Sequence, residues 1–269
     1  AEYLMLAQPD QDLQCSAVLA GGNTGIDAQR ALEAQWLTLM DTPESCSRVF
    51  QSLVKAGRFS ADDIWQRFRR QVETKRFTGA RQTLDWLPDG QEPASAALSM
   101  ALENPARYLN SPAGHSPVSR PGRELTMAAI TRLARSDVHE ALARWHSIDG
   151  AFREEDRAYV SGQLGWMAAL AQLGEALPLY GQARGVAMSD EQRAWQVRAA
   201  LRAGDWAGVR QAIEGMNTAQ RDLPEWNYWL GRALNHQGKT QDARALFSRQ
   251  ASQPSFYGIL SVEALGITR

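Results

Sequence analysis

Apolar residues recur along most of this chain at spacings of three and four positions, which is the period of an α-helix. The segment after Ser60 shows the pattern clearly. Its start is also marked, because Ser60-Ala-Asp-Asp63 provides an N-cap and acidic residues for the first turn. No alternating β-branched run of useful length occurs, so strands are not expected. One face of the segment after Ser60 carries Ile64, Trp65, Phe68 and Val72.

Turn residues set the expected bounds of the helices. Asp27 is a candidate N-cap, Pro43 ends one helix, and Gly57 is a candidate C-cap glycine. The expected helices span about 1–7, 27–40, 44–56, 60–75, 77–86, 93–103, 106–110, 124–135, 138–148, 153–173 and 175–181, followed by three further pairs of elements that end at 255–265.

The C-terminal part of the chain contains an internal repeat. A shift of 34 residues places Trp195 on Trp229, and both copies carry a glycine in a short turn, Gly204 and Gly238. This is the period of a helix-turn-helix repeat, and one such hairpin cannot bury its own apolar face without a stacked neighbour. The same shift also aligns Arg198 with Arg232, Ala199 with Ala233 and Ile213 with Phe247.

These patterns predict an all-α fold, a right-handed superhelix (solenoid) of stacked antiparallel helical hairpins that is tetratricopeptide-like in its C-terminal half. We expect one superhelical domain over 1–269. A soft internal boundary is expected at about 104–122, because proline interrupts the helical pattern there. The prolines near this boundary are Pro93, Pro105, Pro112, Pro117 and Pro121.

Charge and composition narrow the classes of partner. The formal net charge is −1, so no global field attracts nucleic acid or an anionic membrane. No run of eighteen apolar residues occurs, so no membrane-spanning helix is expected. The chain does not open with the pattern of a signal peptide, and this is expected of a mature protein or an excised segment. Arg supplies 26 of the 29 basic residues. Genome composition explains this bias most simply, and bidentate binding of carboxylates or phosphates is the alternative.

The sequence offers no convincing catalytic, cofactor or metal site. His139 and His146 are seven apart and lack a third ligand, so His115, His139, His146 and His236 are expected to be surface or packed side chains. The acids at Asp62-Asp63 and Glu154-Glu155-Asp156 suit first helical turns better than a general acid and base. Gly21-Gly22-x-x-Gly25 and Gly162-x-x-Gly165 lack the strand that a phosphate-binding loop requires, and no Gly-x-Ser-x-Gly elbow occurs.

Tryptophan is abundant, with nine residues spread over nearly every expected hairpin. Packing between helices is the simpler interpretation, and a concave surface that stacks on sugar rings is the alternative. Trp226, Tyr228 and Trp229 crowd one helix and cannot all face inward.

The two cysteines, Cys15 and Cys46, flank an expected helix, a placement that suits a disulfide. Two buried free thiols in a cytosolic protein are the alternative reading.

Two passages resemble one known family. The first combines Leu13-Gln-Cys15, Trp36-Leu-Thr and Ser45-Cys46-Ser-Arg-Val-Phe50. The second runs from Pro224-Glu-Trp226-x-Tyr-Trp229 through Ala243-Arg-x-Leu-Phe247 to Ser255-Phe-Tyr-Gly258-x-Leu-x-x-Glu-x-Leu-Gly266. Together they resemble the α-superhelical part of the soluble lytic murein transglycosylases of Gram-negative bacteria.

The resemblance implies a periplasmic location and a disulfide between Cys15 and Cys46. The family cleaves the MurNAc–GlcNAc β-1,4 bond of peptidoglycan and leaves a 1,6-anhydro-MurNAc end. Its catalytic Glu-Ser-x-Phe motif belongs to a lysozyme-like domain, whereas Glu44-Ser45 here is followed by Cys46-Ser47. The segment is therefore expected to lack the catalytic domain, and its last helix, 255–266, is expected to lead toward a linker.

The resemblance implies that this chain is a non-catalytic scaffold that holds substrate, and no cofactor is expected. The longer protein to which the segment would belong resembles an enzyme, a lytic murein transglycosylase. The expected partners are peptidoglycan glycan strands, bound through the full-length protein, and other cell-wall enzymes. No nucleic acid and no membrane span are expected, and the chain is expected to be monomeric. The competing hypothesis is a helical-repeat scaffold for protein–protein interaction, unrelated to the cell wall, with free thiols. An enzyme contained within these residues has little support.

Overall fold

The computed structural model describes residues 10–20, 25–115 and 118–267, and within these ranges it contains helices and turns but no strand. The helix expected at 1–7, most of the Gly21–Gly25 loop and Pro117 lie outside the described residues. Contacts between residues divide the chain into two compact units. Unit 1 comprises 1–136 and 144–151, and unit 2 comprises 137–143 and 152–269. The division falls at 137–151, and the Pro-rich segment 104–122 lies within unit 1.

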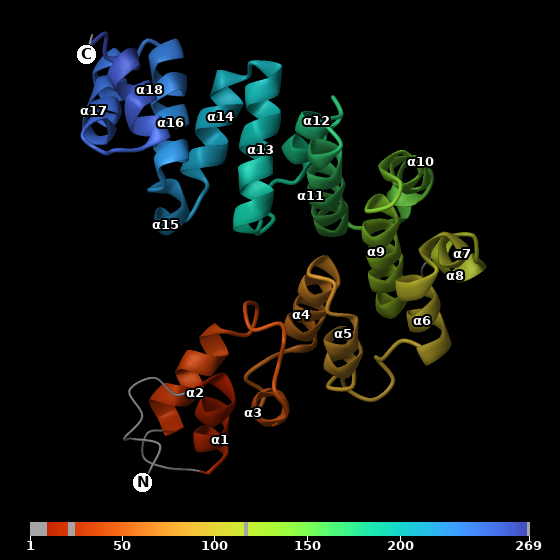
Figure 1. Ribbon diagram of the computed structural model, residues 1–269. Coiled ribbons are helices and arrows are strands. Elements are labelled where there is room, and N and C mark those ends of the chain that lie inside the picture. The colour runs from red at the N-terminus through yellow and green to blue at the C-terminus, as the bar shows by residue number, and fades with distance from the viewer. Residues whose placement is uncertain (1–9, 21–24, 116–117, 268–269) are drawn as a thin grey trace. The chain divides into compact units, whose positions relative to one another are not determined.

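Unit 1 is built from short helices (Figure 1). Helix α10, Val138–Ile148, contributes residues to both units. The helices of unit 1 are α1 Gln11–Leu19, α2 Gly25–Ala34, α3 Glu44–Lys55, α4 Ala61–Glu73, α5 Phe77–Leu84, α6 Ser95–Glu103, α7 Pro105–Leu109, α8 Pro112–His115 and α9 Arg120–Ala134. Among them, α1 packs against α2 and α3, α4 packs against α5 and α9, and α6, α7 and α8 pack against α9.

Local sequence signals fix the ends of α3 and α4. After α3, Gly57 adopts a left-handed φ of 72°, and the Arg58 N–H donates to the Leu53 carbonyl at 2.9 Å. This is the glycine-terminated helix end that the sequence predicts. At the start of α4, Ser60 and Asp63 form a capping box, each side chain bonding the other residue's backbone N–H.

Helix α2 ends earlier than expected. The pattern predicts a helix over 27–40, but α2 spans Gly25–Ala34. After Ala34 the backbone forms turns instead of a helix. There the carbonyls of Trp36 and Leu39 accept hydrogen bonds from the guanidinium of Arg67, which is fully buried. The Trp36 ring stacks on Phe59 with centroids 3.9 Å apart. Tertiary contacts therefore override the local helical pattern at this point.

The Pro-rich region is more helical than expected. Helix α8 was not predicted, and α9 begins at Arg120 instead of Glu124. The Ser119 side chain accepts a hydrogen bond from the Gly122 N–H, and Pro121 sits in the first turn, where its missing N–H costs nothing. Proline here starts a helix instead of interrupting one.

Unit 2 is a series of longer hairpins (Figure 1). Helices α13 and α14 form one hairpin, α16 and α17 form the next, and α14 packs against α16. The glycines of the two hairpin turns, Gly204 and Gly238, both have left-handed φ values, 68° and 76°. The helices of unit 2 are α11 Glu154–Leu170, α12 Ala176–Gln182, α13 Asp190–Ala203, α14 Trp206–Glu214, α15 Thr218–Arg221, α16 Pro224–His236, α17 Thr240–Ala251 and α18 Phe256–Ala264.

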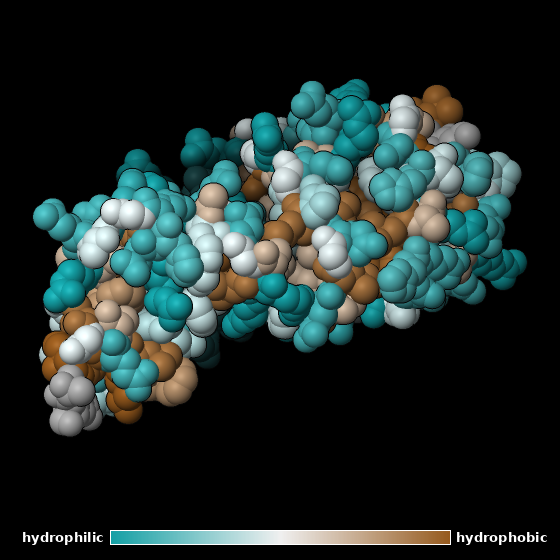
Figure 2. All heavy atoms as spheres, turned by 90° about the horizontal axis from the view of Figure 1, so that it is seen from above, coloured by the Kyte–Doolittle hydropathy of each residue, from teal (hydrophilic) through white to brown (hydrophobic). Residues whose placement is uncertain are grey.

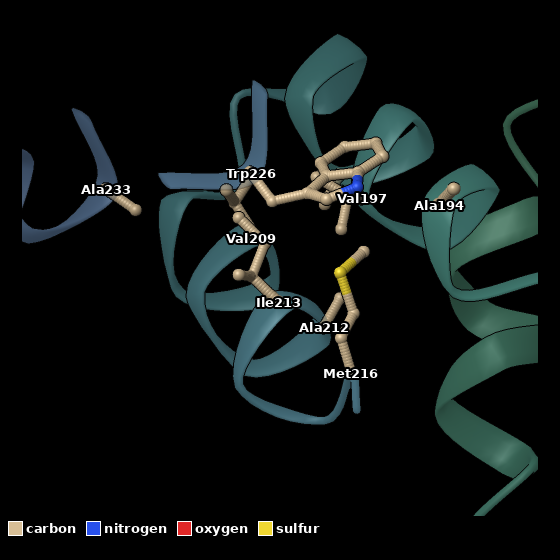
Figure 3. Packing of buried hydrophobic residues seen from close by; sticks show 9 residues of the cluster. Ala194, Val197, Val209, Ala212, Ile213, Met216, Trp226 and Ala233 are labelled. Atoms are coloured by element: carbon tan, nitrogen blue, oxygen red, sulfur yellow. The ribbon is translucent and has the colours of Figure 1, made fainter. Parts of the chain in front are cut away.

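The repeat positions are buried as stacked hairpins require. Ile213 and its equivalent Phe247 are 0% and 3% exposed. Figure 3 shows Ile213 of α14, and Met216 just after that helix, below Trp226 of α16 and Val197 of α13, so one apolar cluster joins consecutive hairpins. The prediction of stacked helical hairpins is confirmed here, because neither hairpin buries this face alone.

Hydrophilic side chains cover most of the molecular face in Figure 2, with hydrophobic ones between them. Every helix in the described ranges is too short or too polar to cross a lipid bilayer.

Candidate functional site

An open groove of about 690 Å³ lies on unit 2 beside α13, α15 and α16. Its volume is within the range of small-molecule and peptide sites. The residues that line it combine carboxylates, one guanidinium and two indoles. They are Asp190, Glu191, Ala194, Trp195, Arg198, Ala219, Gln220, Leu223, Glu225 and Trp226.

One end of the groove is acidic and rigid. Asp190 and Glu191 occupy the first turn of α13, which a capping box between Ser189 and Gln192 holds in place. The Asn217 side-chain amide donates to Asp190 Oδ1 at 2.7 Å. Gln220 Nε2 donates to the Asp190 carbonyl, which ties α15 to the start of α13. The exposed Glu191 side chain is left available to a ligand.

The support of α13 extends to α12. The buried hydroxyl of Tyr180 donates a hydrogen bond to the Gln192 carbonyl at 3.1 Å. Burial raises the pKa of Tyr180, so the phenol stays protonated and remains a donor at physiological pH. Gly165 of α11 allows the close approach, because a Cβ there would lie 3.2 Å from the Tyr180 backbone nitrogen.

The other end of the groove carries a cation between two indoles. The Arg198 guanidinium carbon lies 5.0 Å from the ring centroid of Trp195 and 5.3 Å from that of Trp226. Trp226 is only 4% exposed and is fixed by the apolar cluster of Figure 3. Arg198 is exposed and forms no ion pair with any described residue. The indoles therefore hold its stem while its N–H groups stay free to bind an anion.

The two ends follow from helical geometry. Glu191, Trp195 and Arg198 are spaced i, i+4, i+7, so they share one face of α13. Eight residues from Asp190 to Arg198 rise about 12 Å along the helix. The groove is therefore acidic near the N-terminus of α13 and cationic and aromatic two turns further on. Glu225, in the first turn of α16, adds a third carboxylate.

No protein-family model matches the chain. The soluble lytic murein transglycosylase of Escherichia coli (strain K12) is 22% identical to it over 280 residues, which cover 95% of this chain and 40% of that protein. The chain is related to the soluble lytic murein transglycosylases. The resemblance noted in the sequence is thereby confirmed. The chain spans about 40% of the length of the curated relatives it matches.

Solved structures of lytic transglycosylases share the fold. The enzyme Slt from Pseudomonas aeruginosa, an inactive mutant, aligns with a TM-score of 0.63 at 22% identity, over 96% of this chain and 43% of that one. The 70-kDa soluble lytic transglycosylase of Escherichia coli aligns with a TM-score of 0.52 at 21% identity, over 97% and 43%. A 70-kDa soluble lytic transglycosylase in complex with bulgecin A also gives a TM-score of 0.52, at 19% identity. The prediction of an all-α fold of stacked hairpins is confirmed.

The terminal motif that carries the transglycosylase resemblance has a physical role here. Ser255 accepts a hydrogen bond from the Gly258 N–H and caps α18. A Cβ on Gly258 would lie 2.1 Å from the Gln253 carbonyl oxygen, so no larger residue fits. Tyr257 packs against Tyr228 with ring centroids 5.7 Å apart. Ser, Tyr and Gly therefore seat α18 on the last hairpin.

The cysteine pair of the transglycosylase resemblance lies together in unit 1. The Sγ atoms of Cys15 on α1 and Cys46 on α3 are 1.98 Å apart, with Cα atoms 4.9 Å apart, and both residues are fully buried. The structure therefore forms the disulfide between two helices that α2 separates in the sequence.

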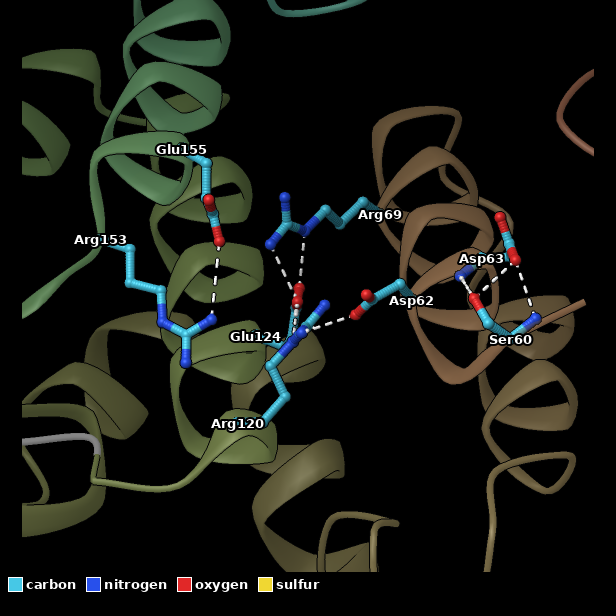
Figure 4. A network of polar contacts seen from close by, with 8 residues as sticks. All are labelled: Ser60, Asp62, Asp63, Arg69, Arg120, Glu124, Arg153 and Glu155. Carbon is cyan, nitrogen blue, oxygen red and sulfur yellow. Dashed lines mark hydrogen bonds and ion pairs between the residues drawn. The ribbon is translucent and has the colours of Figure 1, made fainter.

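The acidic pairs are structural. Asp63 completes the capping box of α4, and Asp62 pairs with Arg120 at 2.8 Å (Figure 4). Glu154, Glu155 and Asp156 lie in the first turn of α11, as predicted. These carboxylates are committed to helix ends and ion pairs rather than paired with one another for acid–base chemistry.

The other candidates do not assemble into a site. His115, His139, His146 and His236 are exposed, and His236 stacks on Trp206 at 4.0 Å. Gly162 and Gly165 lie within α11; Gly165 faces α12, and Gly162 faces the segment that follows it. Across the described part of the chain, no group of three His, Cys, Asp or Glu side chains could hold a metal ion.

Most tryptophans pack between helices, and two arginines bind carboxylates through paired hydrogen bonds. Trp36, Trp65, Trp145, Trp166 and Trp226 are buried, and the other four tryptophans are partly buried. On α16, Trp226 and Tyr228 face inward while Trp229 is only partly buried, as the crowding predicts. Arg58 binds Glu33 and Arg69 binds Glu124 through paired hydrogen bonds, so two arginines do grip carboxylates bidentately.

The groove is not apparent from the sequence alone. Its residues come from three helices between 190 and 226, and only their packing brings them together. The available signal was the spacing of Glu191, Trp195 and Arg198 on one helical face.

Proposed function

We propose that this chain is the helical region of a periplasmic protein that acts on murein, and that it holds or guides murein instead of cleaving it. The relation of 95% of the chain to a soluble lytic murein transglycosylase carries the proposal. The groove on unit 2 supports a binding role, because it combines fixed aromatic rings with accessible charged groups.

The cysteine pair supports the location. A buried disulfide between α1 and α3 suits an oxidising compartment such as the periplasm, where such bonds persist. In the competing hypothesis of a cytosolic scaffold for protein partners, the same two cysteines would be free thiols.

The cleavage itself is proposed to belong to a part of the protein outside these 269 residues, since the matched relatives are much longer than this chain. There, a single protonated carboxylic acid would donate its proton to the glycosidic oxygen of the MurNAc–GlcNAc β-1,4 bond. It would then act as a base while the MurNAc 6-hydroxyl attacks, which gives 1,6-anhydro-MurNAc. One acid suffices because the substrate supplies its own nucleophile.

Co-sedimentation tests the proposal. The purified chain is incubated with insoluble murein sacculi at low and high salt, and the pellet and supernatant are analysed. We expect retention that weakens as salt rises, because exposed charges are screened. We also expect no soluble 1,6-anhydro-muropeptides from the chain alone. Failure to pellet at low salt would contradict the murein-holding role and favour the protein-scaffold alternative. Release of anhydro-muropeptides would contradict the non-catalytic assignment.

A further inference from the structure

The groove on unit 2 separates opposite charges along one helix. Asp190 and Glu191 mark one end, and Arg198 marks the other about 12 Å away along α13. A neutral N-acetylated glycan has no groups that match this pattern. A short peptide with an amino group at one end and a carboxylate at the other matches it directly.

We propose that this groove binds the peptide part of murein, with a peptide carboxylate on Arg198 and a peptide amino group at Glu191. The assignment rests on the proposed murein function for the source of the peptide. The groove chemistry alone defines the ligand as a short zwitterionic peptide.

The Arg198 end is built for a carboxylate. Its guanidinium is already oriented by Trp195 and Trp226, at 5.0 and 5.3 Å, so little side-chain freedom is lost on binding. A planar fork of N–H groups matches a carboxylate in a bidentate geometry. The buried face of Trp226 excludes water from one side, which strengthens the attraction.

The Glu191 end is built for an amino group. Asp190 is engaged by Asn217, which leaves Glu191 as the carboxylate of α13 that is exposed and without a partner in the structure. Glu225 on α16 lines the same groove and adds negative potential. An ammonium group placed here gains attraction from the Glu191 carboxylate.

Peptide titration followed by tryptophan fluorescence and calorimetry tests the inference. The probe is the sugar-free murein tetrapeptide alanyl-γ-glutamyl-diaminopimelyl-alanine, used at low salt with the purified 269-residue chain. Two derivatives are used beside it, one acetylated at its amines and one amidated at its carboxylates. Tetra-N-acetylchitotetraose serves as the glycan probe. Trp195 lies in the groove, so a bound peptide is expected to change the fluorescence.

The variants separate the two ends. Arg198→Gln is expected to raise the Kd of the free peptide about fivefold, and to have no effect on the amidated peptide. Glu191→Gln is expected to raise the Kd about twofold for the free peptide, with no effect on the acetylated peptide. Matched controls are Arg202→Gln, on the same helix outside the groove, and Glu263→Gln on α18, both exposed. Circular dichroism confirms that each variant is folded.

The outcomes distinguish this inference from the proposed function. Retention on sacculi without affinity for the peptide would overturn the groove assignment and leave the murein role standing. Binding of the peptide with equal affinity by Arg198→Gln, or binding of the glycan probe in its place, would also overturn the assignment. Peptide binding without retention on sacculi would overturn the murein role, and with it murein as the source of the peptide.

Discussion

Arg69 on α4 and Glu124 on α9 are joined by two hydrogen bonds, from Nε to Oε2 at 2.7 Å and from Nη2 to Oε1 at 2.8 Å. The Glu124 side chain is fully buried, and Arg120 adds a third bond to it at 2.8 Å (Figure 4). Arg120 also reaches the exposed Asp62 of α4. One carboxylate thereby fixes α4 to α9 through Arg69 and Glu124, which are 55 positions apart in the sequence.

Removal of this carboxylate is expected to destabilise unit 1. Glu124→Ala removes the buried carboxylate that both Arg69 and Arg120 bind, at a cost of about 3 kcal/mol in the free energy of unfolding, measured by urea denaturation. Glu44→Ala is the control, because Glu44 and its partner Arg48 are both exposed and solvent screens the pair, so its loss should change the unfolding free energy far less. Equal effects of the two substitutions would show that the buried triad does not hold α4 to α9.

The disulfide is expected to stabilise the N-terminal helices. Cys15 and Cys46 close a loop with a sequence separation of 31, and chain-entropy arguments give about 4 kcal/mol for such a link. The double variant Cys15→Ser/Cys46→Ser should lose about this amount. In the parent chain, addition of a reductant should have a similar effect. Mass spectrometry after alkylation without reductant should find no labelled cysteine, and labelling of both would contradict the disulfide.

Close packing between α16 and α17 depends on Gly231. A Cβ at this position would lie 2.6 Å from the Phe247 ring, and that ring is 3% exposed and cannot swing away. Gly231→Ala should therefore cost about 1–3 kcal/mol of unfolding free energy. Gly181→Ala is the control, since Gly181 lies in α12 with open space around it and alanine favours helix.

A double-mutant cycle isolates the steric cause. In a Phe247→Leu background the added cost of Gly231→Ala should shrink, because the smaller side chain removes the clash. An unchanged cost would mean that the ring contact is not responsible.

The pair Glu33–Arg58 should make stability depend on pH. Hydrogen bonds from Arg58, and then from Gln29, hold the pKa of Glu33 below its usual value of 4.5. A lowered carboxyl pKa in the folded state contributes stability that is present above about pH 4.5 and is lost as the pH falls through the folded-state pKa. Glu33→Gln should therefore lower the urea midpoint at about pH 7, and the difference from the parent should shrink steadily as the pH falls below about 4.5. A difference that does not change with pH would rule out this linkage.

The groove depends on contacts between helices that the sequence pattern does not show. Trp195 and Arg198 are visible in the sequence as repeat positions, but their partner Trp226 belongs to a different helix. Only the packing of α16 on α13 and α14 places the second indole beside the guanidinium. The acidic residues at 190–191 are equally visible as a helix start, and nothing in the local pattern shows that α15 and α16 make them one wall of a groove.

The sequence by itself determined the helical class, the hairpin repeat, the caps at Ser60 and Gly57, and the relation to a murein-acting family. The helical class, the repeat and the caps follow from the apolar period and from turn chemistry, which act over a few residues, whereas the relation to the family rests on the resemblance of its motifs. The tertiary structure alone decided where α2 ends, that prolines 112 and 121 start helices, that the chain divides at 137–151, and which charges meet in the groove. Those outcomes depend on long-range partners such as the buried Arg67, whose need for acceptors outweighs the local preference for helix around Trp36.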